Sequence, residues 1–173
     1  MTIRHATLAD APALAVLGAR TFIDTFVEGF AIPYPQADLD AFMAEVFSEA
    51  TIREAIAAPK AEWLVAEDGV GRIVAFATTG PCSLPHPDAT AANAELKRLY
   101  VDRSAQGAGY GTILLKAALA RMDRDFTGPQ WIGVWSGNLK AQRLYAAYGF
   151  EKAGEYQFPV GAWRDDEFIL RKG

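Results

Sequence analysis

The sequence predicts a mixed α/β fold, in which helices pack against a sheet. Three observations lead to this prediction: hydrophobic residues recur at helical spacing over the first 60 residues, the pattern changes to that of strands near residue 61, and strands and helices then alternate. The chain has 173 residues, of which 51% are hydrophobic and 12% aromatic. That length and composition are typical of one domain with a packed core, so we expect a single domain over residues 1–173.

The elements are expected in a definite order. In the first part we predict a strand at 3–6, a helix opened by the capping box Thr7–Asp10 and continuing to Phe26, a break at Ile32–Pro35, a helix over Leu39–Phe47, and a short helix opened by a second box, Thr51–Glu54. In the second part we predict strands at 61–67 and 72–79 around the turn 68–71, a loop at 80–90, a strand at 95–101, a helix at 110–124 with Ile113, Leu114, Ala117, Ala118 and Met122 inward, a strand at 131–135, a helix at 138–148, and strands at 151–158 and 167–171.

Charge and cysteine content exclude several classes of protein. With 17 Lys and Arg against 21 Asp and Glu, the formal net charge is −4, which argues against a nucleic-acid binder. The one cysteine excludes an intramolecular disulfide, and no Cys/His cluster has zinc spacing, so no metal is expected. No apolar run is long enough to cross a bilayer and no signal-peptide core follows Met1, so we expect a cytoplasmic protein with no membrane partner.

A glycine-rich segment, Gln106-Gly107-Ala108-Gly109-Tyr110-Gly111-Thr112, lies between a predicted strand and a predicted helix. Glycines there allow successive backbone amides to turn toward one point, and the helix start adds unpaired donors that suit phosphate. The segment lacks the Gly-Lys-Ser/Thr ending of a Walker loop and the Gly-x-Gly-x-x-Gly of a dinucleotide loop. Two interpretations stay open: a phosphate cradle of another kind, or a turn that binds nothing.

A second motif begins at Asn138, a residue type that favours the N-cap of a helix. Ala141 and Tyr145 are four residues apart and share one helix face, where the small side chain leaves room beside the tyrosine. Gly149-Phe150 then ends the helix. A tyrosine at this spacing is more typical of a core than of a catalytic site, but its pairing with the glycine-rich segment favours function.

Together these motifs resemble the GNAT superfamily of acetyl-CoA-dependent N-acetyltransferases. The resemblance depends on Leu99-Tyr100-Val101, on Gln106 to Gly111, and on Asn138-(x2)-Ala141-(x3)-Tyr145-(x3)-Gly149-Phe150, in that order. The chain is also similar to PaiA-type polyamine (spermidine/spermine) acetyltransferases, through Thr21-Phe22-Ile23-Asp24-Thr25-Phe26, Glu95 to Val101, Gly133-Val134-Trp135 and Phe158-Pro159-Val160-Gly161.

The resemblance implies a fold and a cosubstrate site. It implies a mixed, mostly antiparallel sheet with a V-shaped splay between two central strands, here 95–101 and 131–135, and acetyl-CoA bound in the gap. The cofactor-binding residues that it implies are Leu99, Tyr100 and Val101 for the pantetheine and thioester, Gln106, Gly107, Ala108, Gly109, Tyr110, Gly111 and Thr112 for the pyrophosphate, and Asn138 and Lys140 for the pantetheine or nucleotide end. Arg103 and Arg143 are weaker candidates for the ribose phosphate.

The resemblance also implies direct attack of a neutral amine on the thioester. Tyr145 matches the family's acid for the leaving thiolate, and Glu95 is the first candidate for the base, with a strand-end salt bridge to Lys97 as the alternative role. Cys82 is expected to be a bystander and His5 to lie on a strand surface, whereas His86, in the loop at 80–90, is a minor candidate for a group bordering the site.

Charge distribution points to the acceptor. Residues 1–60 hold eight acidic and four basic side chains, whereas 61–173 hold 13 of each, so the acidic excess lies in the segment that walls the acceptor side in GNAT folds. An acidic wall attracts a small cationic amine such as a polyamine, with Asp24, Glu28, Asp38 and Asp40 as candidates. The alternative for each of them taken singly is a solvated helix face. The alternatives are a protein N-terminus, lysine, amino acid or amino sugar as acceptor, or a non-catalytic acyl-CoA-binding module; a homodimer is left open.

Overall fold

The computed structural model describes residues 2–173. Its helices and strands follow one another as β1 Thr2–His5, α1 Ala11–Phe22, α2 Gln36–Val46, α3 Glu49–Ala57, β2 Glu62–Glu67, β3 Ile73–Pro81, β4 Ala94–Val101, α4 Tyr110–Asp125, β5 Gln130–Trp135, α5 Leu139–Ala146, β6 Glu151–Val160 and β7 Trp163–Lys172. Short 3-10 turns lie at Leu8–Asp10 and Arg103–Ala105, and a π-helical segment at Ile23–Gly29.

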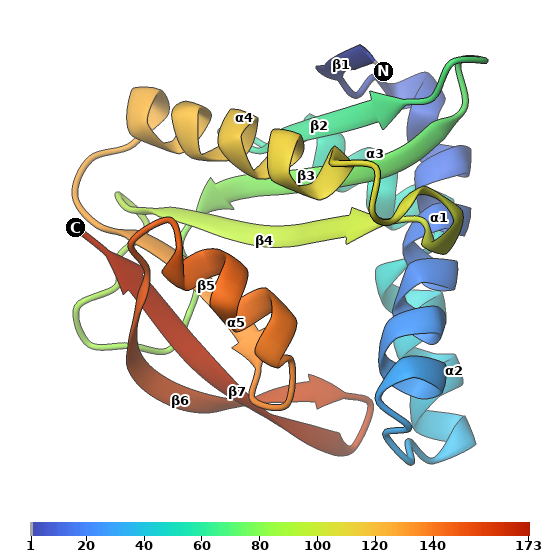
Figure 1. The fold of residues 1–173 in the computed structure, drawn as a ribbon. Coiled ribbons are helices and arrows are strands. Elements are labelled where there is room, and N and C mark those ends of the chain that lie inside the picture. Colours follow the sequence, from blue (N-terminus) through green and yellow to red (C-terminus); the bar gives the residue numbers. More distant parts are fainter. Residues whose placement is uncertain (1) are drawn as a thin grey trace.

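Within residues 2–173 the seven strands form one open sheet in the order β1-β2-β3-β4-β5-β7-β6 (Figure 1). Neighbouring strands run antiparallel except β4 and β5, which run parallel. The predicted mixed, mostly antiparallel sheet is therefore confirmed.

The parallel pair β4–β5 is joined over only three residues. Ala94, Glu95 and Leu96 pair with Gln130, Trp131 and Ile132, and beyond Leu96 and Ile132 the two strands have no further pairs. Figure 1 shows β5, β6 and β7 turning away from β4. An irregularity in the β3–β4 register between Thr78 and Thr79 accompanies the opening, as expected for a bulge that bends a strand. The splay that the sequence predicts is present at the predicted strands.

Helices cover both faces of the sheet. On one face α4 packs against β2, β3 and β4, and α5 joins the same core through Tyr145. On the other face α1 packs on β3 and β4, with Leu14 and Leu17 beside Phe76. The π-helical segment and α2 extend this second face over the open end of β4, where Phe22 and Phe42 pack with Val160 of β6. The opening is thus enclosed by α4 and α5 on one side and by the N-terminal helices on the other.

The inward face of α4 differs in part from the prediction. Leu114, Ala118 and Met122 are buried as expected, but Leu115 and Leu119 are buried as well. Ile113 was predicted to face inward and this is wrong, since its side chain is 38% exposed. Ala117 is only partly buried. The apolar stripe is rotated because α4 lies across several strands, which places positions 115 and 119 rather than 113 on the sheet.

Element boundaries shift for identifiable reasons. Helix α3 begins at Glu49 rather than at the predicted Thr51 box, because the Ser48 hydroxyl accepts the Thr51 amide proton at 3.1 Å and caps the helix three residues earlier. Strand β3 runs to Pro81, into the predicted loop, since Gly80 and Pro81 pair with β4. Strands β6 and β7 are longer than predicted because they pair along their whole length up to Val160 and Trp163. The helix predicted to continue to Phe26 does continue, but in π geometry.

Candidate active site

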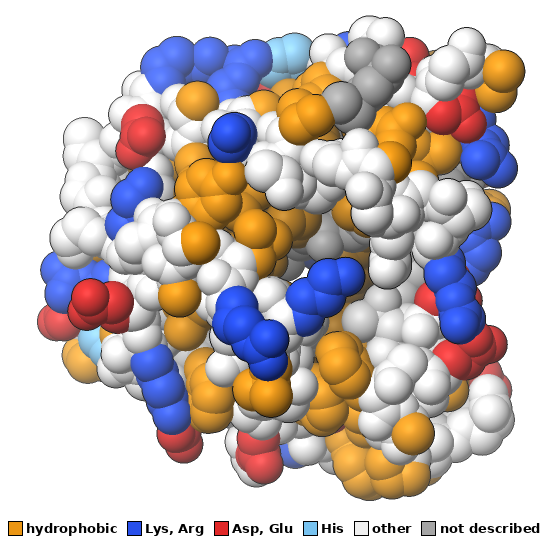
Figure 2. Space-filling model, in the orientation of Figure 1, with side chains coloured by type: hydrophobic (Ala, Val, Ile, Leu, Met, Phe, Trp, Pro, Cys, Tyr) orange, Lys and Arg blue, Asp and Glu red, His pale blue; other side chains and the backbone are white. Residues whose placement is uncertain are grey.

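The opening between β4 and β5 contains a cavity of about 960 Å³. Its wall comes from the end of α1, the π-helical segment, β4, the loop before α4, β5, α5 and the ends of β6 and β7. Figure 2 shows the hollow near the middle of the molecular face, with hydrophobic side chains on its wall and basic side chains at its rim. The glycine-rich segment and the motif that begins at Asn138 therefore both contribute residues to the wall of this cavity.

The glycine-rich segment reaches the cavity and has the backbone of a turn. Gly107 and Gly109 have φ of 83° and 87°, values that residues with a Cβ rarely adopt, and a Cβ at either position would meet no atom within 4 Å. Gly109 is the N-cap of α4, so the unpaired amides of the first helical turn face the segment. The cavity-lining members are Gln106, Gly107, Gly109, Tyr110, Gly111 and Thr112, whereas Ala108 does not line the cavity.

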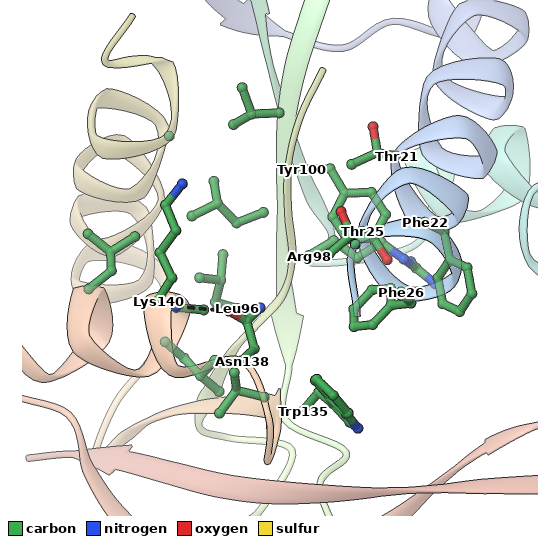
Figure 3. Close-up of a pocket in the computed structure, with 18 of the residues that line it drawn as sticks. Thr21, Phe22, Thr25, Phe26, Leu96, Arg98, Tyr100, Trp135, Asn138 and Lys140 are labelled. Atoms are coloured by element: carbon green, nitrogen blue, oxygen red, sulfur yellow. Dashed lines mark hydrogen bonds between the residues drawn. The ribbon is translucent and has the colours of Figure 1, made fainter. Parts of the chain in front are cut away.

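The second motif faces the same cavity from α5. Asn138 is the N-cap as predicted, since its side-chain oxygen accepts the Ala141 amide proton at 3.0 Å. Asn138, Lys140 and Tyr145 all line the cavity. Figure 3 shows Asn138 and Lys140 on one side of β4, and Thr21, Phe22, Thr25 and Phe26 on the other side. The cavity therefore has an α5 side and an N-terminal-helix side, with β4 between them.

Tyr145 is the buried phenol of the α5 side. Its side chain packs against Phe150 and is 8% exposed. Burial raises the pKa of the Tyr145 phenol well above its usual range, with a smaller contribution from Tyr100. The hydroxyl stays protonated at neutral pH and makes no hydrogen bond within the described part of the chain, residues 2–173. It is free to donate to a group in the cavity.

The free edge of β4 forms the floor of the opening. Leu99, Tyr100 and Val101 line the cavity, and across from them β5 offers no pairing residue. On their other edge they pair with β3. Unpaired backbone groups at a sheet edge are available to an extended ligand.

Glu95 lies where β4 and β5 are still paired, and its carboxylate already has partners within the protein. Its Oε2 accepts hydrogen bonds from the Ser83 amide at 2.8 Å and the Ser83 hydroxyl at 3.1 Å. The Lys97 ammonium lies 2.9 Å from the same oxygen. The geometry therefore matches the salt bridge to Lys97 that the sequence offered as the alternative role of Glu95.

Of the four acidic residues proposed from the N-terminal segment, only Asp24 lines the cavity. Glu28 pairs with Arg103 at 3.1 Å. Asp38 accepts the Ala162 amide proton at 2.7 Å, and Asp40 accepts from the side chain of Gln36 at 2.8 Å. Asp38 thus joins α2 to the turn between β6 and β7, and Asp40 bonds within α2.

The acidic wall of the cavity comes instead from β7, which was not among the sequence-based candidates. Asp165 is buried and accepts hydrogen bonds from Tyr34 at 2.5 Å and from the Trp163 indole at 2.9 Å. Glu167 accepts a hydrogen bond from Tyr156 at 2.5 Å. Both carboxylates line the cavity. The signal available in the sequence was the charged run Asp165-Asp166-Glu167 directly before the hydrophobic residues Phe168-Ile169-Leu170.

Burial raises the pKa of Glu167 from 4.5 to about 7, and the neighbouring charges of Asp165 and Glu95 act in the same direction. The hydrogen bond from Tyr156 opposes this shift. Burial and the nearby carboxylate of Glu167 raise the pKa of the Tyr156 phenol. Tyr156 therefore keeps its proton and is the donor in the hydrogen bond to Glu167. Glu167 changes its protonation state near neutral pH.

The remaining polar candidates lie away from the cavity, with the exception of Arg103. Cys82 is buried, which raises the pKa of its thiol, and His86 packs its ring on Trp131 at 4.9 Å. His5 contacts Glu62. Neither the thiol nor the two imidazoles line the cavity, nor does Arg143, whereas Arg103 does. Within residues 2–173 no group of three or more His, Cys, Asp or Glu side chains is arranged to hold a metal ion, and no helix is long and apolar enough to span a membrane.

Comparison with known proteins gives a consistent result. Residues 23–150 match the model of the Acetyltransferase (GNAT) family. An uncharacterised N-acetyltransferase of Mycobacterium tuberculosis is 29% identical over 163 residues, which cover 94% of this chain and 97% of that protein.

Two solved structures show the same fold. PaiA N-acetyltransferase from Thermoplasma acidophilum, in complex with coenzyme A, has a TM-score of 0.74 at 18% identity and covers 99% of both chains. Ribosomal-protein-alanine N-acetyltransferase from Brucella melitensis has a TM-score of 0.67 at 24% identity, again over 99% of both chains.

Proposed function

The chain belongs to the acetyltransferase (GNAT) family and is an acetyl-CoA-dependent N-acetyltransferase, and we propose that its acceptor is a small cationic primary amine such as a polyamine. One observation carries the proposal. Asp24, Asp165 and Glu167 line the acceptor side of the cavity, and no Lys or Arg within residues 2–173 forms an ion pair with any of them. Carboxylates without a cationic partner attract a cation.

Aromatic side chains support the same proposal. Phe26, Phe30 and Trp135 line the cavity beside these carboxylates, and the rings of Phe30 and Trp135 lie 4.6 Å apart. Aromatic faces accept ammonium groups and the methylene chains between them. Arg98 is a basic side chain on this side, and its guanidinium lies over the Phe47 ring, 5.7 Å from the ring centre. The resemblance of Thr21–Phe26 and Glu95–Val101 to PaiA-type polyamine acetyltransferases agrees with this assignment.

The geometry of the cavity supports an assignment of the residues that hold acetyl-CoA. The amides of Gly107 to Thr112, at the start of α4, suit the pyrophosphate. The free edge of β4 at Leu99 and Val101 suits the pantetheine arm, which pairs there like an added strand. Asn138 and Lys140 approach from α5 and contact the pantetheine or the nucleotide end. When bound, acetyl-CoA supplies an activated acetyl group on sulfur.

The chain's own groups then assist the transfer. A backbone amide at Leu99 or Tyr100 donates to the thioester oxygen, where negative charge grows as the amine nitrogen bonds to the acetyl carbon. The carbon–sulfur bond breaks, and the Tyr145 hydroxyl gives its proton to the leaving sulfur. The proton lost by the newly acylated nitrogen restores the phenol through water.

A thiol-release assay with a panel of acceptors tests the acceptor class. The full chain is given acetyl-CoA with spermidine, spermine, an amino acid, an amino sugar, and peptides with an N-terminal alanine or an internal lysine. We expect the highest kcat/KM with a polyamine and a fall in kcat/KM as salt is added, because screening weakens the attraction to the acidic wall. Efficient turnover of a peptide or amino acid, with polyamines near background, would show that the acceptor is wrong. Tight acetyl-CoA binding without turnover of any amine would favour a regulatory module.

A further inference from the structure

The carboxylate of Glu167 lies at the point where the sheet opens. Glu167 pairs with Trp135 in the β5–β7 register, and its Oε2 lies against Gly133, where an added Cβ would be 3.1 Å from this oxygen. The same Cβ would be 2.6 Å from the Tyr156 hydroxyl. Gly133 is the first residue of β5 beyond its last pair with β4. The absence of a side chain at Gly133 therefore leaves room for the carboxylate beside the mouth of the gap.

Glu167 differs from the other carboxylates of the cavity in its partners. Only the Tyr156 hydroxyl donates to it, at Oε2, and within residues 2–173 its Oε1 has no hydrogen bond. Both oxygens of Asp165 are engaged by Tyr34 and Trp163. Glu95 accepts three hydrogen bonds at Oε2, one of them from the Lys97 ammonium, and Asp24 accepts none within residues 2–173. A carboxylate that is to receive a proton needs a free oxygen. Glu167 has one, its carboxylate lies beside Gly133 at the mouth of the gap, and it lacks the cationic partner that Glu95 has.

The surroundings of Glu167 are acidic or phenolic on most sides. Asp165 on its own strand and Glu95 on β4 contribute negative charge. The phenol of Tyr156 contacts Glu167 from β6. The phenols of Tyr34 and Tyr100 lie close enough for the charge of Glu167 to raise their pKa values. Of the basic side chains of β4, Lys97 pairs with Glu95. Arg98 lies over the Phe47 ring and close to the Tyr100 phenol, where its charge opposes the rise in the pKa of Tyr100 caused by burial. Burial raises the pKa of Glu167 to about 7, and the charges of Asp165 and Glu95 act in the same direction, against the hydrogen bond from Tyr156.

We propose that Glu167 is the catalytic base that takes the proton from the acceptor's ammonium group, and that Glu95 instead positions Ser83 and Lys97. In this step an N–H bond of the ammonium breaks, an O–H bond forms on Glu167, and the nitrogen keeps the electron pair with which it attacks the acetyl carbon. Glu167 later releases the proton to water. The proposal rests on the proposed function only in that the acceptor is a primary amine; it does not require a polyamine.

The test compares Glu167→Gln with Glu95→Gln and Asp24→Asn in the full chain, with whichever acceptor of the panel is turned over best. Each variant removes one negative charge from the cavity wall. We expect Glu167→Gln to lower kcat by about 10²–10⁴-fold, the usual range for a general base, with CoA affinity within about threefold of wild type. Asp24→Asn should act mainly on KM, and Glu95→Gln should keep the wild-type pH profile.

The pH profile separates a base from a structural group. In the wild type, kcat/KM should rise with pH through about 7, as Glu167 ionises, and then level off. In Glu167→Gln this limb should disappear, and the rate should keep rising toward the pKa of the free amine, about 10. Tyr156→Phe is a second variant that retains the carboxylate. Its loss of a hydrogen bond to the ionised form should move the limb to higher pH without abolishing turnover.

Two results would overturn the proposal. One is a Glu167→Gln enzyme with wild-type kcat and an unchanged pH limb. The other is the large loss in kcat and the loss of the limb in Glu95→Gln instead. Because the acceptor is taken from the panel, a failure of the polyamine assignment leaves this comparison intact.

Discussion

At the scale of single residues, the burial of the Tyr145 phenol explains how this side chain can act as a proton donor. The hydroxyl is enclosed on the α5 side of the cavity, and the raised pKa keeps it protonated while a thiolate departs. We predict that Tyr145→Phe lowers kcat by about 10²–10⁴-fold, because the departing sulfur loses its proton donor. Steady-state kinetics and CoA titration measure both effects, and CoA affinity should change little.

Tyr148 offers a matched control for this variant. It is a partly buried tyrosine that packs against the same core as Tyr145. Tyr148→Phe should keep kcat within about twofold. If Tyr145→Phe also kept the wild-type rate, Tyr145 would have no role in the transfer.

Residue roles were predictable only where the motif is local. Asn138 and Tyr145 sit on one helix at fixed spacing, so sequence alone brings them to one face. Glu167 escaped prediction because its position depends on pairing with Trp135 and Tyr156, which no local pattern encodes. Asp38 and Asp40 do not line the cavity, and this was unpredictable for the converse reason: a net charge over 60 residues does not say which carboxylates are used by backbone and side-chain donors.

At the scale of elements, the turn into α4 is the part whose backbone is most constrained. Gly109 has φ of 87° at the N-cap, a value that valine rarely adopts. Gly109→Val would therefore change the directions of the backbone amides of Gly107 to Thr112. We predict a loss in CoA affinity of tenfold or more, on the order of 1.4 kcal/mol or above, by calorimetric titration.

Gly71 serves as the matched control, because it has φ of 81° in the β2–β3 turn and does not line the cavity. Gly71→Val should introduce comparable backbone strain and lower the melting temperature, while CoA affinity stays at the wild-type value. Equal loss of affinity in the two variants, or none in Gly109→Val, would mean that the turn does not hold the pyrophosphate.

The order of elements was predictable, because periodicity changes sharply from helical to strand spacing near residue 61. The details that failed have tertiary causes. The π-helical segment Ile23–Gly29 is only seven residues long, which is too short for hydrophobic spacing to distinguish i→i+5 from i→i+4 bonding. Ile113 was misplaced because the direction from which the sheet approaches α4 is set by the packing of several strands.

At the scale of the whole molecule, the site costs stability. The pKa of Glu167 is raised from its ordinary value of 4.5 to about 7, so the folded protein binds this proton more tightly than the unfolded chain. The contribution of Glu167 to the free energy of unfolding therefore falls as pH rises from about 4.5 to about 7, and stays low above that range. Function at this position opposes stability at neutral and alkaline pH.

Glu167→Gln should reveal this cost. We predict that the free energy of unfolding of the variant, relative to that of the wild type, is about 2 kcal/mol higher at pH 8 than at pH 5. The reason is that glutamine is neutral at both pH values and still accepts the Tyr156 hydrogen bond. Urea unfolding at the two pH values measures the difference. A gap that is the same at both would contradict a raised pKa at this position.

The unpaired edge of β4, together with the turn into α4, is central to the proposed function because these two segments hold acetyl-CoA in the opening of the sheet. Amide hydrogen exchange of the full chain with and without CoA tests this most directly. We expect slower exchange on CoA addition in peptides that cover 97–101 and 106–112, and no change in the β2–β3 turn at 68–72. Protection confined to other segments, with 97–101 and 106–112 unchanged, would contradict it.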